Sequence, residues 1–236
     1  MECKPFKIKE NLFDSGLLAR KVGEIFCFEK IINYEAEIEK IARKENYNLV
    51  CFSSPATEDL QRFKYKGTLI SLEIEIQNFK ENIQKLPDKY ELKDFLIENW
   101  DYIENSIPHL WGSRFSNDEN ITFKNYQKHK LKLIKHYFQN YPSIFKVRET
   151  KEGYDAFLFS YLKNEDLVYY EGFITENYRT GLLGTSLLKQ TVNEGIKKGA
   201  QRVKTNVYSD NIRFLKTYKG LGFKETGEKH FYHLWP

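Results

Sequence analysis

Hydrophobic and polar positions follow a period of two in some stretches of this chain and a helical period in others. Strand-like runs cover 22–28, 48–52 and 68–76. Residues 34–44 carry apolar side chains on one face and charges on the other, which predicts an amphipathic helix. Residues 57–60 are expected to open a short helix with an N-terminal cap. The resulting order β-α-β-α-β predicts a small packed β/α unit.

A domain junction is predicted where this pattern stops. Residues 80–90 are polar and contain Pro87, a composition typical of segments between domains. We therefore assign residues 1–85 to an N-terminal β/α domain and residues 86–236 to a second domain.

The second domain begins with two predicted helices, over 91–106 and from Thr122 to just before Pro142. A polar and aromatic loop, 111–120, separates them. Strand-like runs then cover 143–149, 154–162, 166–175 and 202–209. The last residues, 223–226 and 231–235, are expected to form a closing hairpin across Gly227.

A turn between the run 166–175 and the next helix is the first chemical signal. Apolar positions at helical spacing follow Arg179–Gly184, and Gly199 ends that pattern. Gly181 and Gly184 allow a tight turn or a close approach. The first N–H groups of a helix lack partners within it, so with the helix dipole they favour an anion such as a pyrophosphate. The alternative is an ordinary strand–helix connection.

A second stretch follows the run 202–209 and reads Asn-Ile-Arg-Phe-Leu-Lys-Thr-Tyr-Lys-Gly-Leu-Gly-Phe from Asn211 to Phe223. Together the two stretches resemble the GNAT acetyltransferase superfamily. In that superfamily an Arg/Gln-x-x-Gly-x-Gly/Ala turn holds the acetyl-CoA pyrophosphate, and an Asn, a Tyr and Gly-Phe mark the next helix. The matching positions here are Arg179, Gly184, Asn211, Tyr218 and Gly222-Phe223. The family's middle glycine falls on Leu182, and Gly181 lies one place earlier.

The resemblance implies an α+β fold with a central mixed sheet over about residues 90–236, preceded by the N-terminal unit as an addition. It implies acetyl-CoA as co-substrate. The implied cofactor-binding residues are Phe173, Ile174, Arg179, Thr180, Gly181, Leu182, Leu183, Gly184, Thr185, Asn211 and Tyr218.

Three of the residues in these stretches have alternative interpretations. Tyr218 is expected to protonate the leaving thiolate, but its helical position also suits a core aromatic. Glu171 is either a base acting through water or a solvated carboxylate. Asn211 either contacts the pantetheine arm or caps its helix. The resemblance assigns the oxyanion contact to the backbone N–H of Phe173 or Ile174.

The nearest resemblance within the superfamily is to the dTDP-fucosamine acetyltransferases, which share an N-terminal β/α unit and a Ser-Arg-Phe stretch, here Ser113-Arg114-Phe115. It implies a nucleotide-linked 4-amino sugar as acceptor, with the 111–120 loop and the N-terminal domain walling the acceptor side. Trp111, Arg114 and Phe115 are the candidate substrate-binding residues, since a guanidinium suits phosphate and rings suit a sugar or base. The alternative is a surface Arg with two anchoring aromatics. Another amine acceptor and a non-catalytic acyl-CoA-binding module also stay open.

Composition limits the classes of partner and the cellular compartment that the sequence predicts. The net charge of +4 is mild and its basic residues are scattered, which does not indicate nucleic-acid binding. No run approaches the ~18 apolar residues of a spanning helix. Three cysteines without a C-x-x-C pair, and no apolar signal core, predict a reducing, cytoplasmic location. The histidines show no metal-ligand spacing, so no metal site is expected. The oligomeric state is open, with a homodimer as one option.

Overall fold

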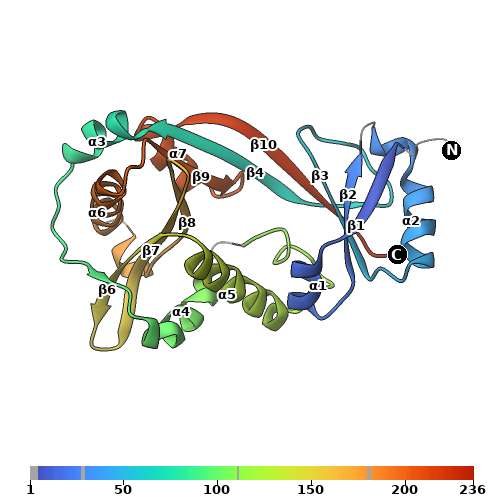
Figure 1. Cartoon of the computed structure of the whole chain (residues 1–236), viewed down its shortest axis with the longest axis horizontal. Coiled ribbons are helices and arrows are strands. Elements are labelled where there is room, and N and C mark those ends of the chain that lie inside the picture. The colour runs from blue at the N-terminus through green and yellow to red at the C-terminus, as the bar shows by residue number, and fades with distance from the viewer. Residues whose placement is uncertain (1–4, 28–29, 111, 180–181) are drawn as a thin grey trace. The chain divides into compact units, whose positions relative to one another are not determined.

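The chain forms both strands and helices in a computed structural model that describes residues 5–27, 30–110, 112–179 and 182–236 (Figure 1). The strands are β1 (Phe6–Glu10), β2 (Val22–Cys27), β3 (Leu49–Ser54), β4 (Lys64–Glu75), β5 (Lys93–Asp94), β6 (Ser143–Thr150), β7 (Gly153–Lys163), β8 (Asp166–Ile174), β9 (Arg202–Tyr208) and β10 (Lys224–Leu234). The α-helices are α1 (Leu12–Leu18), α2 (Glu35–Lys44), α3 (Ile76–Gln84), α4 (Trp100–Ser106), α5 (Phe123–Asn140), α6 (Leu183–Lys197) and α7 (Ile212–Gly220). Short 3-10 helices are η1 (Ile31–Asn33), η2 (Ile97–Asn99), η3 (Ile107–His109) and η4 (Glu176–Tyr178). The predicted mixed α/β class is confirmed.

Contacts divide the chain into two units that do not follow a single cut near residue 85. Unit 1 joins Met1–Leu69 with Gly112–His129 and Gly227–Pro236. Unit 2 comprises Ile70–Trp111 and Lys130–Thr226. Because β4, α5 and β10 contribute residues to both units, sequence position alone does not separate them.

Unit 1 contains a sheet with the strand order β1-β2-β3-β10-β4. β1 and β2 are antiparallel, β2 and β3 are parallel, and β3 and β10 are antiparallel. The helix α2 is the crossover between the two parallel strands, and its buried Ile38 and Ala42 lie four residues apart on one face. These side chains pack with residues of β2, β3 and β10 in one core cluster.

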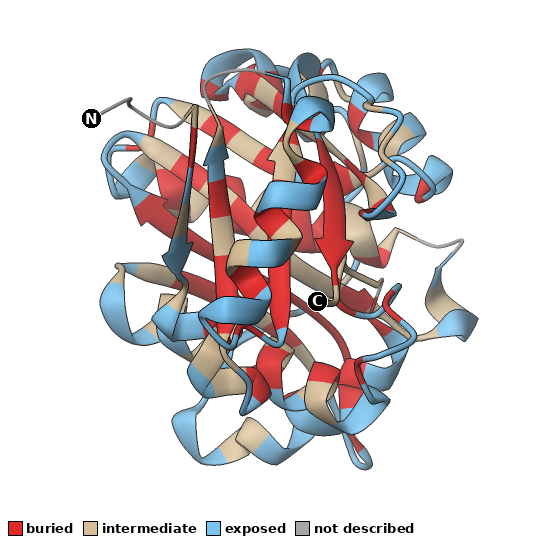
Figure 2. Ribbon diagram, turned by 90° about the vertical axis from the view of Figure 1, so that its right-hand side faces the viewer, coloured by how far each residue is buried: buried red, intermediate tan, exposed pale blue. Residues whose placement is uncertain are grey.

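Unit 2 contains strands in the order β4-β9-β8-β7-β6-β5. The β5–β8 part is antiparallel, and β8 pairs with β9 in parallel across the α6 crossover. Residues of α3, α6 and α7 pack in one core cluster and residues of α4 and α5 in another, with alternate β7 residues in each. The helices therefore cover both faces of these strands (Figure 1). Figure 2 faces unit 1 and shows the exposed outer side of α2 in blue in front of largely buried strands.

The predicted helix over 91–106 begins only at Trp100, because the residues before it join the edge of the sheet. Lys93 and Asp94 pair with β6, and the Phe95 N–H donates to the Phe145 carbonyl at 2.9 Å. The Phe95 ring stacks on Phe145 with centroids 4.4 Å apart. Burial of this ring in the sheet outweighs the helical spacing of the segment.

The predicted helix at 57–60 is absent from the structure, and 57–60 is irregular. Side chains bind the backbone donors there: the Glu58 N–H donates to the Tyr232 hydroxyl at 2.8 Å. The Gln61 and Arg62 N–H groups donate to the Glu35 carboxylate at 3.1 and 2.6 Å. These long-range partners replace helical hydrogen bonds.

The closing hairpin is also wrong, because β10 runs as one strand from Lys224 to Leu234 and Gly227 lies inside it. Its last five residues pair with β3, so the chain end completes the sheet of unit 1 instead of folding back. The pattern also missed β1, α1 and α3.

A buried Asp–His pair anchors the 112–129 segment to β10 in unit 1. His233 is fully buried, and its Nδ1 donates to Asp118 Oδ2 at 2.5 Å. Burial opposes ionisation of Asp118, but donors from His233, the Asn120 N–H and Trp235 hold the pKa of that carboxyl well below its ordinary range. Burial lowers the pKa of His233 below its ordinary 6.5 and outweighs the opposing effect of Asp118. The folded protein therefore holds a neutral imidazole beside a charged carboxylate.

This pair predicts a loss of stability on mild acidification. Below pH 6.5 an unfolded His233 takes up a proton that the folded one resists. The free energy of unfolding should then fall with pH by at most about 1.4 kcal/mol per pH unit. Urea unfolding between about pH 7 and about pH 5 measures this slope. His233→Gln should flatten it, whereas His136→Gln, which changes an exposed histidine, should keep it. Equal slopes in both variants would contradict the assignment.

Candidate functional site

Strands β8 and β9 separate part-way along their length in unit 2. Their parallel pairing runs from Asp166↔Arg202 to Tyr169↔Thr205, whereas β8 continues to Ile174. An irregularity in the β7–β8 register, where Ser160 faces Tyr169 and Phe159 faces Glu171, lies at the same point. Such a bulge bends a strand and ends regular pairing. The β8 residues beyond Tyr169 thus present backbone groups that β9 does not pair in the described ladder.

The start of α6 lies beside this opening. Leu182 is the N-cap residue, and its apolar side chain makes no hydrogen bond to the first N–H groups of the helix. Among the described residues, the Ser186 N–H makes the first hydrogen bond of the turn, to the Leu182 carbonyl at 3.0 Å. The amides of Leu183, Gly184 and Thr185 precede that bond and are directed outward along the axis. Together with the dipole they form an anion-binding geometry.

Gly184 matters because the helix start packs closely on the end of β8. A Cβ built on Gly184 would lie 3.1 Å from Cδ1 of Ile174, a tight contact. A glycine therefore lets the first turn of α6 approach the strand. Leu182, which occupies the family's middle-glycine position, serves as the N-cap, while Thr180 and Gly181 lie outside the described residues.

The link from β8 toward α6 is described from Thr175 to Arg179. The Thr175 N–H donates to the Asp155 carbonyl at 2.8 Å, and η4 follows at once. Arg179 Nε donates to the Ile174 carbonyl at 3.1 Å while the residue stays exposed. Arg179 is thus placed at the end of β8, close in sequence to the α6 amides.

Tyr218 lies on α7 with its phenol directed to the point where β8 and β9 separate. Thr205, the last β9 residue of the ladder, lies close enough to lower the pKa of the Tyr218 phenol, and its own hydroxyl donates to the Tyr169 carbonyl at 3.1 Å. The ring packs on Phe223 with centroids 5.0 Å apart, in the α6-side core. Burial raises the pKa of Tyr218 far above its ordinary value, with Glu171 adding to the shift and Thr205 opposing it. The Tyr218 ring therefore packs in the core, and its hydroxyl keeps its proton at the opening.

Asn211 is the N-cap of α7, and its side chain accepts from the Phe214 N–H at 3.4 Å. The capping interpretation therefore describes its contact in this structure. Contact with a pantetheine arm stays a prediction.

Glu171 and Phe173 share the α5 side of the opening. Lys130 on α5 forms an ion pair with Glu171, and only 10% of the Glu171 side chain is exposed. The Phe173 ring packs near Phe157 and His109, with centroids 5.8 and 6.0 Å away. Glu171 is therefore a paired, largely buried carboxylate and differs from the predicted solvated alternative.

The predicted acceptor residues that the structure describes belong to unit 1. Arg114 Nη2 donates to Asp14 Oδ2 at 3.1 Å, and Asp14 Oδ1 lies 2.8 Å from His129 Nε2. Phe115 is buried, with its ring 4.6 Å from that of His129. These contacts are those of a segment anchored to its own unit. Trp111 lies outside the described residues, and the acceptor role stays a prediction.

Sequence reasoning missed Thr205 and Lys130, which hold Tyr218 and Glu171. Thr205 is one of several polar residues in its strand, and its role depends on where the ladder ends. Lys130 lies in a lysine-rich helix that a solvated face explains equally well. Only the tertiary contacts distinguish them from their neighbours.

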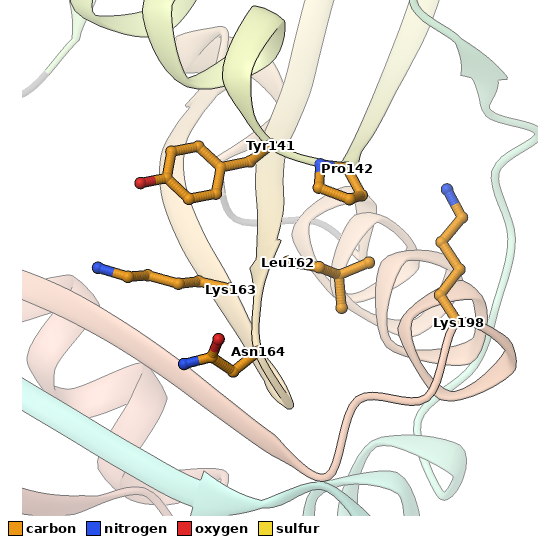
Figure 3. A pocket seen from close by; sticks show the side chains of 6 residues that line it. All are labelled: Tyr141, Pro142, Leu162, Lys163, Asn164 and Lys198. Carbon is orange, nitrogen blue, oxygen red and sulfur yellow. The ribbon is translucent and has the colours of Figure 1, made fainter.

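A hollow of about 690 Å³ lies at the other end of the same strands (Figure 3). It is lined by Tyr141, Pro142, Leu162, Lys163, Asn164 and Lys198. These residues surround the β7–β8 turn and the last turn of α6, so this hollow is remote from the α6 start. Among the described residues, no helix combines the length and apolarity needed to cross a bilayer, and no cluster of three metal-ligating side chains forms.

No family model matches the sequence, and no curated protein matches it. Solved structures do match. A protein of unknown function from Staphylococcus epidermidis has TM-score 0.67 and 14% identity, covering 100% of this chain and 92% of its own. A tandem GNAT protein from the clavulanic acid pathway has TM-score 0.61 and 10% identity, covering 90% and 74%. A GCN5-related N-acetyltransferase from Sphaerobacter thermophilus has TM-score 0.59 and 8% identity, covering 97% and 75%.

This chain has the GNAT fold. The opening between β8 and β9 and the uncapped start of α6 therefore belong to a fold shared with known acetyltransferases, as the sequence resemblance predicted. None of these three proteins is described as acting on a nucleotide sugar, so the resemblance to the dTDP-fucosamine family stays a prediction.

Gly184→Asp tests the anion site at the α6 start. The carboxylate would add a side chain against Ile174 and a negative charge beside the first amides of α6. Affinity for CoA should fall at least about tenfold, about 1.4 kcal/mol, in calorimetry. Gly227→Asp is the matched control, because a Cβ there meets open space. Unchanged CoA affinity in a folded Gly184→Asp protein would refute the site.

Proposed function

We propose that this protein is an acetyl-CoA-dependent N-acetyltransferase. The observation that carries the proposal is the opening between β8 and β9, with uncapped amides at one side and the buried Tyr218 phenol at its vertex. A single extended ligand with a pyrophosphate fits this arrangement. Its amide-bearing arm would pair with β8 as an added strand, and its phosphates would meet the α6 start.

Each chain element has a role in this proposal. The backbone of Phe173 and Ile174 binds the pantetheine arm, and one of their N–H groups stabilises the oxyanion. The amides of Leu183, Gly184 and Thr185 bind the pyrophosphate. Thr180, Gly181, Leu182 and Asn211, with the Arg179 side chain, complete the proposed set.

Tyr218 is the proposed general acid. The amine attacks the thioester carbonyl, the carbon–sulfur bond breaks, and the leaving thiolate takes the phenol proton. A thiol has an ordinary pKa near ~8.5, so a phenol that stays protonated supplies that proton at neutral pH. Thr205, at the end of the ladder, is the β9 neighbour of this phenol.

Glu171 is the proposed route for removing the amine proton through water. Glu171 forms an ion pair with Lys130 of α5. The pair also holds the carboxylate on the α5 side of β8, away from the α6 start.

The acceptor class rests on the sequence resemblance. We propose a nucleotide-linked 4-amino sugar, with Trp111, Arg114 and Phe115 as binding residues. Since Asp14 already binds the Arg114 guanidinium, a diphosphate would have to compete for it. A different amine acceptor, or acyl-CoA binding without catalysis, is the alternative, and capture on immobilised CoA followed by thiol release with an amine panel separates the three.

Tyr218→Phe keeps the ring and removes the proton. If Tyr218 is the acid, kcat should fall roughly a hundredfold or more while acetyl-CoA affinity barely changes. Phe214→Leu alters a neighbouring aromatic on α7 and serves as the control for packing. A loss of stability with kcat intact would instead identify Tyr218 as a core aromatic alone.

Arg114→Ala tests the acceptor. A nucleotide-linked 4-amino sugar should show a KM raised about tenfold or more, because a charge-assisted contact is lost, with KM for acetyl-CoA unchanged. A free amino sugar without a diphosphate should be acetylated as before. If KM rose equally for both acceptors, or if thermal stability fell with both KM values unchanged, Arg114 would have only a structural role through its contact with Asp14.

A further inference from the structure

Arg148 and Asp155 form an ion pair beside the turn that leads from β8 to α6. Arg148 lies on β6 and Asp155 on β7, and Nη2 is 2.9 Å from Oδ2. The guanidinium carbon lies 4.1 Å from the ring centroid of Tyr178 and 5.0 Å from that of Tyr90. We call Tyr90, Arg148, Asp155 and Tyr178 the Arg148 cluster.

The cluster contacts the turn in two ways. The Thr175 N–H donates to the Asp155 carbonyl at 2.8 Å, which fixes the backbone where β8 ends. Tyr178, the last residue of η4, places its ring over the Arg148 guanidinium. Backbone and side chain of the turn are therefore held by the same neighbouring strands.

The cluster also reaches α6 from a second direction, through the segment that carries Tyr90. The Tyr90 carbonyl accepts from Gln190 Nε2 at 3.0 Å. The Lys89 N–H donates to Ser186 Oγ at 3.4 Å, and Lys189 Nζ donates to the Leu86 carbonyl at 3.3 Å. Arg148 thus connects the turn that leads toward α6 with a segment that contacts the first half of α6.

The energetics of the pair argue against a role in stability alone. Arg148 Nη1 and Asp155 Oδ1 are buried without hydrogen-bond partners among the described residues. Burial raises the pKa of Asp155, and Arg148 opposes that shift. A buried pair with unsatisfied atoms contributes little net stability, and positional specificity is one recognised use of such pairs.

We propose that Arg148 is the positioning residue that fixes the Thr175–Arg179 turn and, through it and Tyr90, the start of α6. The inference rests on the proposed acyl-CoA site, because its benefit is to preset the α6 amides for a pyrophosphate. Donors must lie within about half an ångström of the productive geometry, so a loosely held turn weakens binding. The cation beneath Tyr178 holds that ring at little cost in entropy.

Tyr178→Leu removes the ring and leaves the Arg148–Asp155 pair intact, so the fold is retained. Arg148→Met with Asp155→Asn removes both charges together and avoids a buried unpaired carboxylate. Arg148→Lys is the conservative variant. Arg202→Met is the matched control, because it breaks another Arg–Asp pair, that of Arg202 with Asp166 at the far end of β8. Lys204 still pairs with Asp166 in that variant. Each protein is measured for CoA affinity by calorimetry, for melting temperature, and for ligand-free amide exchange.

Tyr178→Leu and the double variant should weaken CoA binding about tenfold, with the melting temperature little changed. Arg148→Lys should restore most of the affinity, and Arg202→Met should match the wild type. The Tyr178 and Arg179 amides, which donate within the turn, should exchange faster in the first two variants only. Wild-type affinity and exchange in a folded Tyr178→Leu protein would overturn the proposal. If the wild type bound no CoA, the proposed function would fail, and the exchange data alone would still test Arg148.

Discussion

The separation of β8 from β9 is the constraint on which the rest of unit 2 depends. A parallel pair inside a sheet normally leaves no backbone group unpaired, and unpaired groups are costly where water is excluded. Here the ladder ends at Tyr169 and Thr205, at the level of the β7–β8 irregularity. Tyr218 and the start of α6 matter for the proposed binding because they lie beside the part of β8 that β9 does not pair.

The two faces of the opening differ in chemistry. On the α6 side lie the first amides of the helix, which the N-cap side chain does not cap, a glycine contact with Ile174, and a phenol whose proton is retained by burial. On the α5 side lie the paired charges of Glu171 and Lys130 and the ring of Phe173. An anionic cofactor on one side and an amine on the other would each meet complementary groups. This asymmetry supports acyl transfer better than a simple binding module, which would not require a protonated acid at the vertex.

Ion pairs in this protein serve different purposes according to burial. The pair of Lys93 and Glu149 is exposed and contributes little to stability. Two largely buried pairs differ from it: Arg148–Asp155 carries unsatisfied atoms, and Asp118–His233 joins a carboxylate to a neutral imidazole. Their effect is to fix one arrangement of the segments they join, the 112–129 segment in unit 1 and the turn before α6 in unit 2.

The sequence by itself determined the elements whose signal is local. Alternation identified β6 to β9, and the glycine turn and Asn211 cap identified the starts of α6 and α7, because these patterns depend on neighbours a few residues away. Tertiary structure decided the elements whose partners are distant. Phe95 packs at a sheet edge, the Glu35 carboxylate accepts from the 61–62 backbone, and β10 completes the unit 1 sheet. The local periodicity of hydrophobic residues predicts none of these contacts. The same holds for the site: its glycine turn and Tyr218 were visible in the sequence, whereas Thr205, Lys130 and Arg148 acquire roles only through contacts across the sheet.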